Sequence, residues 1–343
     1  MSKKLSRWAL ACVLLSALSL LLAACGSSSS GATTTAGTVA IPSKPESGTI
    51  TMTTQPWIGY GMWIVAQKQG FFAKQGIDVE STNFGENATN DAALEQGKFD
   101  AANLPTNIAT RLIAAGVPLT AVLLMDHSVS ADAVLAGPGI TSIKQLKGKS
   151  VSYEVGSTSD QLIRHALQVN GMSLNDIHAV PSTAAAAADA LIAGKVAAAV
   201  TYQPYITTAT KNDKSLHVIY DSGQAPGLIT DVFMVKTSFL KSKPGQVAAL
   251  LRSWQEAIDF YNSNHTKAES IIATAFGTPL ASLAPSFAGV TLYSLRGALE
   301  QLEGPFPKET EAAESADVSA GELPHTVAPS QFIDTQFLKA AGG

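Results

Sequence analysis

Residues 93–105 read ALEQGKFDAANLP, and residues 190–204 repeat the arrangement as ALIAGKVAAAVTYQP. In both stretches a helical pattern ends at Gly-Lys, and a run of small apolar residues follows before a proline. Glycine supplies the left-handed turn that ends many helices, and short apolar runs are typical of buried strands. The two stretches therefore predict the same helix–turn–strand unit in two halves of the chain. A chance match in an Ala-rich sequence is the alternative.

Outward from these stretches, predicted strands alternate with predicted helices. The strands are expected at residues 48–54, 77–82, 101–104, 119–125 and 150–153, and the helices between them at 62–69, 87–96 and 105–115. The alternation continues to residue 236, after which helices dominate, beginning with a long amphipathic one at 247–261. This order predicts an α/β protein with layered, largely parallel sheets.

Several motifs carry a resemblance to a known family. They are Trp57-Ile58-Gly59-Tyr60, Gly70-Phe71-Phe72, Gly76-Ile77-Asp78-Val79-Glu80, Gly148-Lys149-x-Val151, the two stretches quoted above and 231–235. In this order they resemble the nitrate/sulfonate/taurine group of ABC substrate-binding proteins, over residues 48–261. One departure is Thr201-Tyr202-Gln203-Pro204, where relatives commonly have a Trp and an acidic residue before the proline. The departure concerns the solute rather than the class.

The resemblance implies the two-lobed periplasmic-binding-protein fold, with two hinge crossings and a ligand cleft between the lobes. We expect the crossings near 136–139 and 235–238, lobe one at 48–135 plus 238–343, and lobe two at 139–234. The implied function is capture of a small organic solute for an ABC permease and its ATPase. We expect a monomer.

The N-terminus indicates export and a lipid anchor. Three basic residues precede an apolar run that ends in Leu22-Ala23-Ala24-Cys25-Gly26. This pattern predicts a signal peptide at 1–24, and it resembles a lipobox in which Cys25 is lipidated and fixes the protein to the bacterial cell membrane. An uncleaved anchor is the alternative. Residues 25–47 are rich in Ser, Thr, Gly and Ala and predict a flexible tether.

The net charge argues against nucleic acid as a partner, and the cysteine content argues against a disulfide. Loss of residues 1–24 removes three basic residues and leaves 20 basic against 27 acidic side chains, a net charge of −7. Such a chain is a poor partner for nucleic acid, since phosphate binding needs basic patches. Cys12 would leave with the signal and Cys25 would carry lipid, so no thiol remains for a disulfide.

Ligands of open α/β sheets bind beyond the carboxyl ends of strands. Four predicted loops lie there, and their candidate residues are Trp57 and Tyr60; Thr106 and Asn107; Gly156, Ser157 and Thr158; and Tyr202 and Gln203. The aromatic side chains of the first loop offer flat faces to an organic solute. Packing within the lobe is the alternative role for Trp57.

Two opposite charges could meet a zwitterion in such a cleft. The Gly-Ser-Thr-Ser run at 156–159 opens a predicted helix and predicts an anion site, with ordinary N-capping as the alternative. Asp231 lies where the resemblance places an amine-binding acid in taurine-type receptors. Pairing with a basic side chain of the protein is the alternative for Asp231, and more so for Glu154.

Catalytic motifs are not supported by the sequence. The dinucleotide, serine-hydrolase and penicillin-binding patterns all fail, and the six histidines form no His-x-x-x-His pair, so we predict no enzyme, no cofactor and no metal. Rival hypotheses are an enzyme related to the thiamine-pyrimidine synthases and a sensory receptor. A taurine-like or aliphatic sulfonate is the favoured solute, and a heteroaromatic precursor, such as a thiamine pyrimidine, is the second.

Overall fold

The computed structural model describes residues 39–85 and 87–343. The predicted signal peptide and Cys25 lie outside the described residues. The flexible tether predicted up to residue 47 is wrong for its last part. Val39 and Ile41 pack against the main core, and Glu46 accepts hydrogen bonds from the Gly245 and Gln246 amides at 3.2 and 3.0 Å. Apolar burial and capping of a helix N-terminus order this segment.

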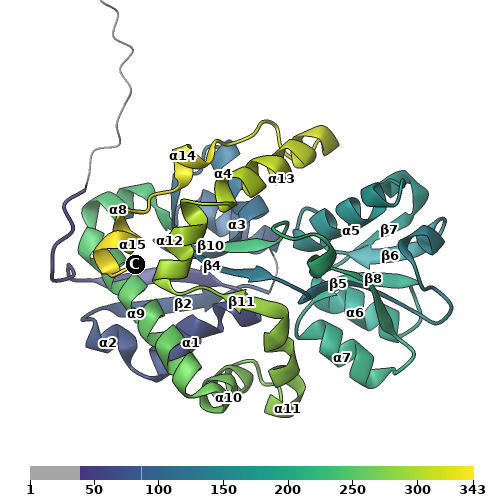
Figure 1. Ribbon diagram of the computed structural model, residues 1–343, viewed down its shortest axis with the longest axis horizontal. Coiled ribbons are helices and arrows are strands. Elements are labelled where there is room, and N and C mark those ends of the chain that lie inside the picture. Colours follow the sequence, from purple (N-terminus) through teal and green to yellow (C-terminus); the bar gives the residue numbers. More distant parts are fainter. Residues whose placement is uncertain (1–38, 86) are drawn as a thin grey trace, which may run out of the picture. The chain divides into compact units, whose positions relative to one another are not determined.

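The first sheet has six strands in the order β11-β4-β10-β3-β1-β2. Its strands are β1 (Thr49–Thr54), β2 (Asp78–Asn83), β3 (Ala101–Pro105), β4 (Leu119–Ser128), β10 (Thr230–Lys236) and β11 (Val290–Leu292). β1 is parallel to β2 and β3, whereas β10 and β11 are antiparallel to their neighbours. The helices around it occupy both faces and share one core with it (Figure 1).

The second sheet has five strands in the order β7-β6-β8-β5-β9. Its strands are β5 (Asp132–Ala136), β6 (Ser150–Tyr153), β7 (His178–Pro181), β8 (Ala198–Tyr202) and β9 (His217–Asp221). β6 is parallel to β7 and β8, and β5 is antiparallel to β8 and β9. The helices beside it are α5 (Thr158–Val169), α6 (Ala184–Ile192) and α7 (Tyr205–Asn212), and they cover two separate apolar clusters.

Twelve described helices pack with the first sheet. They are α1 (Gly61–Lys68), α2 (Phe71–Lys74), α3 (Asn87–Glu95), α4 (Thr106–Ala114), α8 (Thr237–Ser242), α9 (Pro244–Ser263), α10 (His265–Ala275), α11 (Leu280–Leu283), α12 (Leu295–Leu302), α13 (Phe306–Ala320), α14 (Pro329–Phe332) and α15 (Gln336–Ala341). α9 contributes the fully buried Trp254, whose indole donates to the Tyr293 carbonyl at 2.8 Å. The helical C-terminal part therefore completes the first half of the fold, as we expected.

The internal repeat is confirmed by the topology. α3–β3 and α6–β8 occupy equivalent places, because β3 and β8 each pair with the first strand of their own parallel trio. Gly97 and Gly194 end the two helices with the same backbone φ of 65°. Ala101 and Ala198 then begin buried strands, where small side chains allow helices to pack closely.

Two expectations about strand assignment are wrong. Five of the nine strand pairings among the described residues are antiparallel, so the sheets are mixed rather than largely parallel. β5 belongs to the second sheet and β10 to the first, so the chain crosses at 129–131 and 222–229, before each expected crossing. An apolar strand reads alike in either sheet, and long-range pairing decides which one it joins.

Candidate functional site

A cavity lies where residues from both sheets meet. It has about 350 Å³ of empty space, counting the part open to solvent. Its lining residues are Gln55, Trp57, Tyr60, Asn87, Pro105, Asp132, Thr158, Tyr202, Ile229 and Asp231. The carboxyl ends of β1, β3 and β8 contribute to it, which is the position where such sheets bind ligands.

The wall formed by the first sheet is rigid and aromatic. After β1 the chain forms a short 3-10 helix at Ile58–Tyr60, and this turn buries the Trp57 and Tyr60 side chains. The Trp57 indole donates to Asp126 Oδ1 at 3.1 Å, and the Tyr60 hydroxyl donates to Asp231 Oδ1 at 2.5 Å. The polar ends of both rings are therefore fixed, and their apolar surface remains for a ligand.

The second sheet supplies the opposite wall. Tyr202 ends β8, Thr158 begins α5, and Asp132 begins β5. The Tyr202 ring meets Trp57 edge to face, with the ring centroids 5.8 Å apart. Asn87, at the start of α3, donates its backbone N–H to Glu154 at 3.1 Å. The two walls touch directly, and Glu154 has a partner within the protein.

Two buried carboxyl groups, Asp132 and Asp231, line the cavity, and a third, Asp126, accepts a hydrogen bond from the lining residue Trp57. Burial raises the pKa of Asp132 to about 7, and the hydroxyls of Ser128 and Thr158 limit the shift. Burial also raises the pKa of Asp231 to about 6, against the lowering effect of hydrogen bonds with Tyr60 and Asp126. Burial and the neighbouring Asp231 raise the pKa of Asp126 well above its usual range. Among the described residues, no Lys or Arg lines the cavity.

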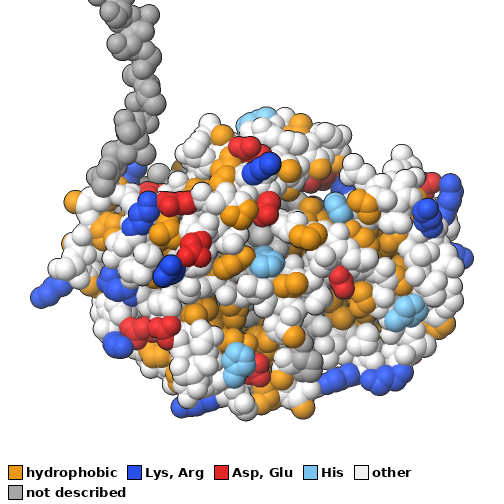
Figure 2. Space-filling view, in the orientation of Figure 1, with side chains coloured by type: hydrophobic (Ala, Val, Ile, Leu, Met, Phe, Trp, Pro, Cys, Tyr) orange, Lys and Arg blue, Asp and Glu red, His pale blue; other side chains and the backbone are white. Residues whose placement is uncertain are grey.

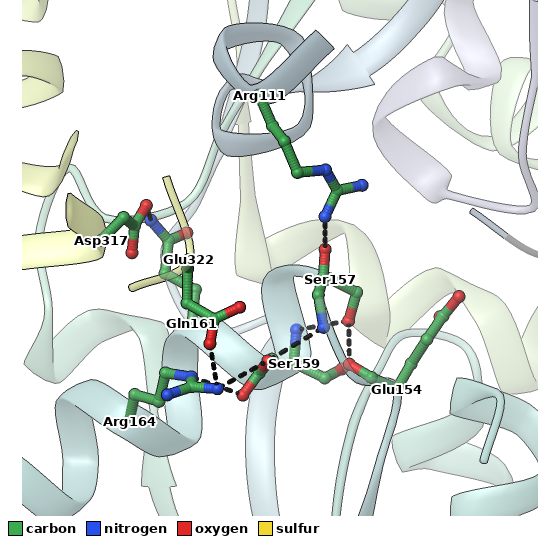
Figure 3. Close-up of polar contacts among 10 residues, drawn as sticks. Arg111, Glu154, Ser157, Ser159, Gln161, Arg164, Asp317 and Glu322 are labelled. Carbon is green, nitrogen blue, oxygen red and sulfur yellow. Dashed lines mark hydrogen bonds and ion pairs between the residues drawn. The ribbon is translucent and has the colours of Figure 1, made fainter. Parts of the chain in front are cut away.

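The predicted anion cradle at 156–159 is largely engaged by the protein itself (Figure 3). The Gly156 N–H donates to Asp160 at 2.9 Å, and the Ser159 N–H donates to Ser157 Oγ at 3.1 Å. The Ser157 hydroxyl donates to the Glu154 carbonyl, and Arg111 donates to the Gly156 carbonyl. The capping alternative therefore holds, but Ser157 is the residue that caps α5, rather than Thr158 or Ser159 as the sequence suggested.

The ten candidate residues separate into two groups in the structure. Trp57, Tyr60, Thr158, Tyr202 and Asp231 line the cavity. The other five lie outside it: Gly156 and Ser157 line a neighbouring polar pocket, Asn107 lies between this pocket and a third one, Thr106 bonds to Thr230, and Gln203 bonds to Thr207 and Ser286.

Six residues at or near the cavity were missing from the sequence candidates. They are Gln55, Asn87, Pro105, Asp126, Asp132 and Ile229. The strongest signal was a lone acid at the end of an apolar strand, as in Asp126 after 119–125 and Asp132 before 133–136. Such an acid is costly to bury unless it has a partner or a function. Among the described residues, no group of three or more His, Cys, Asp or Glu is placed to hold a metal ion.

The molecular surface carries no obvious single-sign field on the face drawn in Figure 2. Lys and Arg lie scattered along its edges there, among acidic and neutral side chains. This face offers no basic stripe of the kind that follows a phosphate backbone.

Two mixed sheets joined by two crossings form the fold of periplasmic binding proteins. The alkanesulfonate-binding protein SsuA from Xanthomonas axonopodis pv. citri superposes with a TM-score of 0.72 at 18% identity, over 87% of this chain and 100% of that one. The chain belongs to the NMT1/THI5-like family, whose model matches residues 58–268.

Sequence relatives fit the same family. A provisionally named binding protein of Brucella abortus is 25% identical over 218 residues, which are 63% of this chain and 67% of the relative. The taurine-binding periplasmic protein of Escherichia coli is 24% identical over 283 residues, or 80% of this chain and 88% of the relative. The resemblance stated from the motifs is confirmed.

The fold alone does not separate binding from catalysis. The desulfurization enzyme DSZB also superposes, with a TM-score of 0.66 at 15% identity, over 86% of this chain and 99% of the enzyme. The named relatives above are nevertheless binding proteins.

Proposed function

We propose that this protein is the extracytoplasmic solute-binding component of an ABC importer. The carrying observation is the cavity lined by residues of both sheets, because a solute held there contacts both halves of the fold. Binding would then favour the closed arrangement of the two halves. The taurine-binding and alkanesulfonate-binding relatives support this reading.

The solute is a small organic molecule with an amine. Asp231 lines the cavity and is buried, so an ammonium group there would provide the opposite charge that a buried carboxylate needs. A taurine-like zwitterion meets this requirement with its amine. A plain alkyl sulfonate has no amine and does not meet it. Its sulfonate also finds no free partner in Arg111, which already bonds to Gly156 and Asp91.

A heteroaromatic amine is the second candidate solute. The edge-to-face pair of Trp57 and Tyr202 supports it, since a flat ring packs well against such walls. A thiamine biosynthesis protein of Haemophilus influenzae gives limited further support. It is 31% identical over 118 residues, only 34% of this chain and 38% of that protein.

Anchoring and delivery complete the proposal. Lipidated Cys25 would keep the receptor at the membrane beside a permease and its ATPase. A sensory receptor would need the same solute site, and transport assays distinguish the two roles.

The test begins with native mass spectrometry of the protein purified from its source, which identifies the solute by mass. Small-angle scattering with and without that solute should show compaction, and deletion of the protein should abolish uptake of the labelled solute. An unchanged radius together with normal uptake would contradict the proposal. Trp57→Ala should weaken binding about tenfold or more through lost apolar contact.

A further inference from the structure

Two carboxyl groups from different sheets line the same cavity. Asp132 begins β5 of the second sheet, and Asp231 lies near the start of β10 of the first sheet. Both line the cavity, and each side chain is only 3% exposed. Any group bound between them contacts both halves of the fold at once.

One of these carboxyl groups has an unused oxygen. Among the residues that the structure describes, Asp132 Oδ2 is buried and has no hydrogen-bond partner, whereas Asp231 accepts the Tyr60 hydroxyl. A buried acceptor without a donor loses its hydrogen bonds to water, so a ligand that donates to it recovers this lost free energy. Its lining also includes no basic side chain from residues 39–85 or 87–343 that could neutralise the pair.

We propose that the solute carries a nitrogen cation with several N–H donors, and that this cation lies between Asp132 and Asp231. The inference rests on the proposed receptor function and narrows its ligand. A protonated amine or an amidinium group has the required charge and at least two N–H directions. Its body would lie against Trp57 and Tyr202, where the ring faces also favour a cation.

The same geometry disfavours an anionic group in this part of the cavity. A sulfonate beside Asp132 and Asp231 would place like charges together in a buried site, where screening by water is weak. The two arginines that line the neighbouring polar pocket are engaged elsewhere, Arg111 with Asp91 and Arg164 with Asp160 and Glu322. An acid group of a zwitterion must therefore point away from the two carboxyls.

Cation binding should release protons. The groups that face the two carboxyls are Tyr60, Asp126, Thr158, Ser128 and Tyr202, and none of them is a cation. With a pKa of about 7, Asp132 is partly protonated near neutral pH, and a bound cation favours its ionised form. Lowering the pH through 6 should therefore weaken the binding of a cationic ligand and leave the binding of an anionic ligand unchanged.

The experiment uses three ring compounds of similar shape: benzamidine, benzamide and benzenesulfonate. Titration calorimetry at pH 7.5 should show binding of the benzamidinium cation and at least tenfold weaker binding of neutral benzamide and of the sulfonate. Repeating the titration in buffers of different ionisation enthalpy measures proton release. Asp132→Asn should weaken benzamidinium at least tenfold, whereas the matched surface change Asp213→Asn should have no effect.

Two outcomes would overturn the inference. One is binding of benzenesulfonate as tight as, or tighter than, benzamidinium. The other is a natural solute, identified by mass spectrometry, that has no cationic nitrogen at pH 7. If such an anionic solute compacts the protein and is imported, the receptor function stands and only the cation assignment fails. If the solute causes no compaction and deletion of the protein causes no uptake defect, the proposed receptor function itself is wrong.

Discussion

Asp126 and Asp231 are cross-strand partners, since they pair in register between β4 and β10. Both side chains are buried, and like charges at paired positions of an antiparallel sheet destabilise it. Because two adjacent buried carboxylates do not ionise together, one of them holds a proton. The Tyr60 hydroxyl already stabilises an ionised Asp231, so the proton belongs on Asp126, which can donate it to Asp231.

This arrangement makes Asp126 a neutral positioning residue. Asp126→Asn keeps a donor for Asp231 and an acceptor for the Trp57 indole, so affinity for the solute should change less than about threefold. Asp231→Asn removes the negative charge, and loss of a charged hydrogen bond of roughly 1.5–3 kcal/mol should weaken binding about tenfold or more. Calorimetry on both variants, with circular dichroism as the folding control, checks this. Equal losses in the two variants would contradict it.

Stability of the ligand-free protein should fall as the pH rises from about 4 to 7. Asp231 and Asp132 have folded-state pKa values of about 6 and about 7, above the usual value of 3.8. Between these limits the folded state binds more protons than the unfolded state, so the free energy of unfolding decreases with pH. The slope is about 1.4 kcal/mol per pH unit for each such group.

Other buried acids also make the stability fall as the pH rises, so a variant is needed to isolate the contribution of the cavity acid Asp132. Burial raises the pKa of Glu314 to about 7 and that of Asp317 to about 6. Thermal melts of the wild type and of Asp132→Asn between pH 4.5 and 8 should differ in slope, with the variant the less pH-dependent. Parallel curves would show that Asp132 titrates normally.

Local sequence signals were sufficient for much of the fold. The glycines at 97 and 194 and the small residues after them predicted two equivalent helix–strand units, because turn and packing requirements are local. The sheet membership of β5 and β10 was not predictable in this way. Each is a short, mostly apolar strand. The partners of β5 in β8 lie 62 or more residues away along the chain, and β10 pairs with β3 on one side and β4 on the other.

The site was predictable only in part for a related reason. Aromatic residues beside glycines, as in Trp57 and Tyr60, indicated a cavity wall from sequence alone. The role of Asp132 depends on a wall that faces it across the cavity, and a single acid between loops carries no such information. The run at 156–159 predicted an anion site, whereas Asp160 and Ser157 supply the capping bonds themselves.

Gly59 is required where the chain passes closest to the carboxyl cluster. A Cβ at this position would overlap the Asp126 carboxyl and the Trp57 indole nitrogen. Gly59→Ala should therefore displace both groups and destabilise the protein by roughly 1–3 kcal/mol, as overpacking does. Gly85→Ala is the control, since its Cβ would meet nothing within 4 Å. Denaturant unfolding of both variants measures the difference, and equal stability would contradict the assignment.

Cys25 should carry the anchor that keeps the receptor at the cell surface. Cys25→Ser removes the thiol needed for lipidation, so the protein should be released from membranes or processed incorrectly. Two acyl chains, at about 0.8 kcal/mol per buried CH₂, anchor a protein firmly. Without them, the protein should be almost completely lost from the pellet of a membrane-pelleting assay. Cys12→Ser is the matched control, because it changes a residue within the predicted signal peptide. A membrane-bound, normally processed Cys25→Ser protein would contradict the lipid anchor.

Arg164 and Glu322 link the two halves of the fold outside the cavity (Figure 3). Arg164 of α5 meets Glu322, just after α13, at 2.5 Å, and Gln161 donates to Asp317 of α13 at 3.3 Å. α13 packs on α4 beside the first sheet, so these contacts favour the closed arrangement. Both charged side chains are partly exposed, at 25% and 36%, and such pairs contribute roughly 0.2–1 kcal/mol.

Glu322→Gln should therefore shift the ligand-free protein toward open forms. We expect a larger radius of gyration in small-angle scattering and an affinity for the solute reduced about two- to fivefold, because closure then costs more free energy. Glu303→Gln is the control, since it breaks an ion pair that lies within the first half alone, with Lys339 at 2.6 Å, and that is more exposed than the Arg164–Glu322 pair. If both variants behave alike, the Arg164–Glu322 pair does not influence closure. High salt should reproduce the effect of Glu322→Gln in the wild type and add little in the variant, because the remaining contacts are less sensitive to screening.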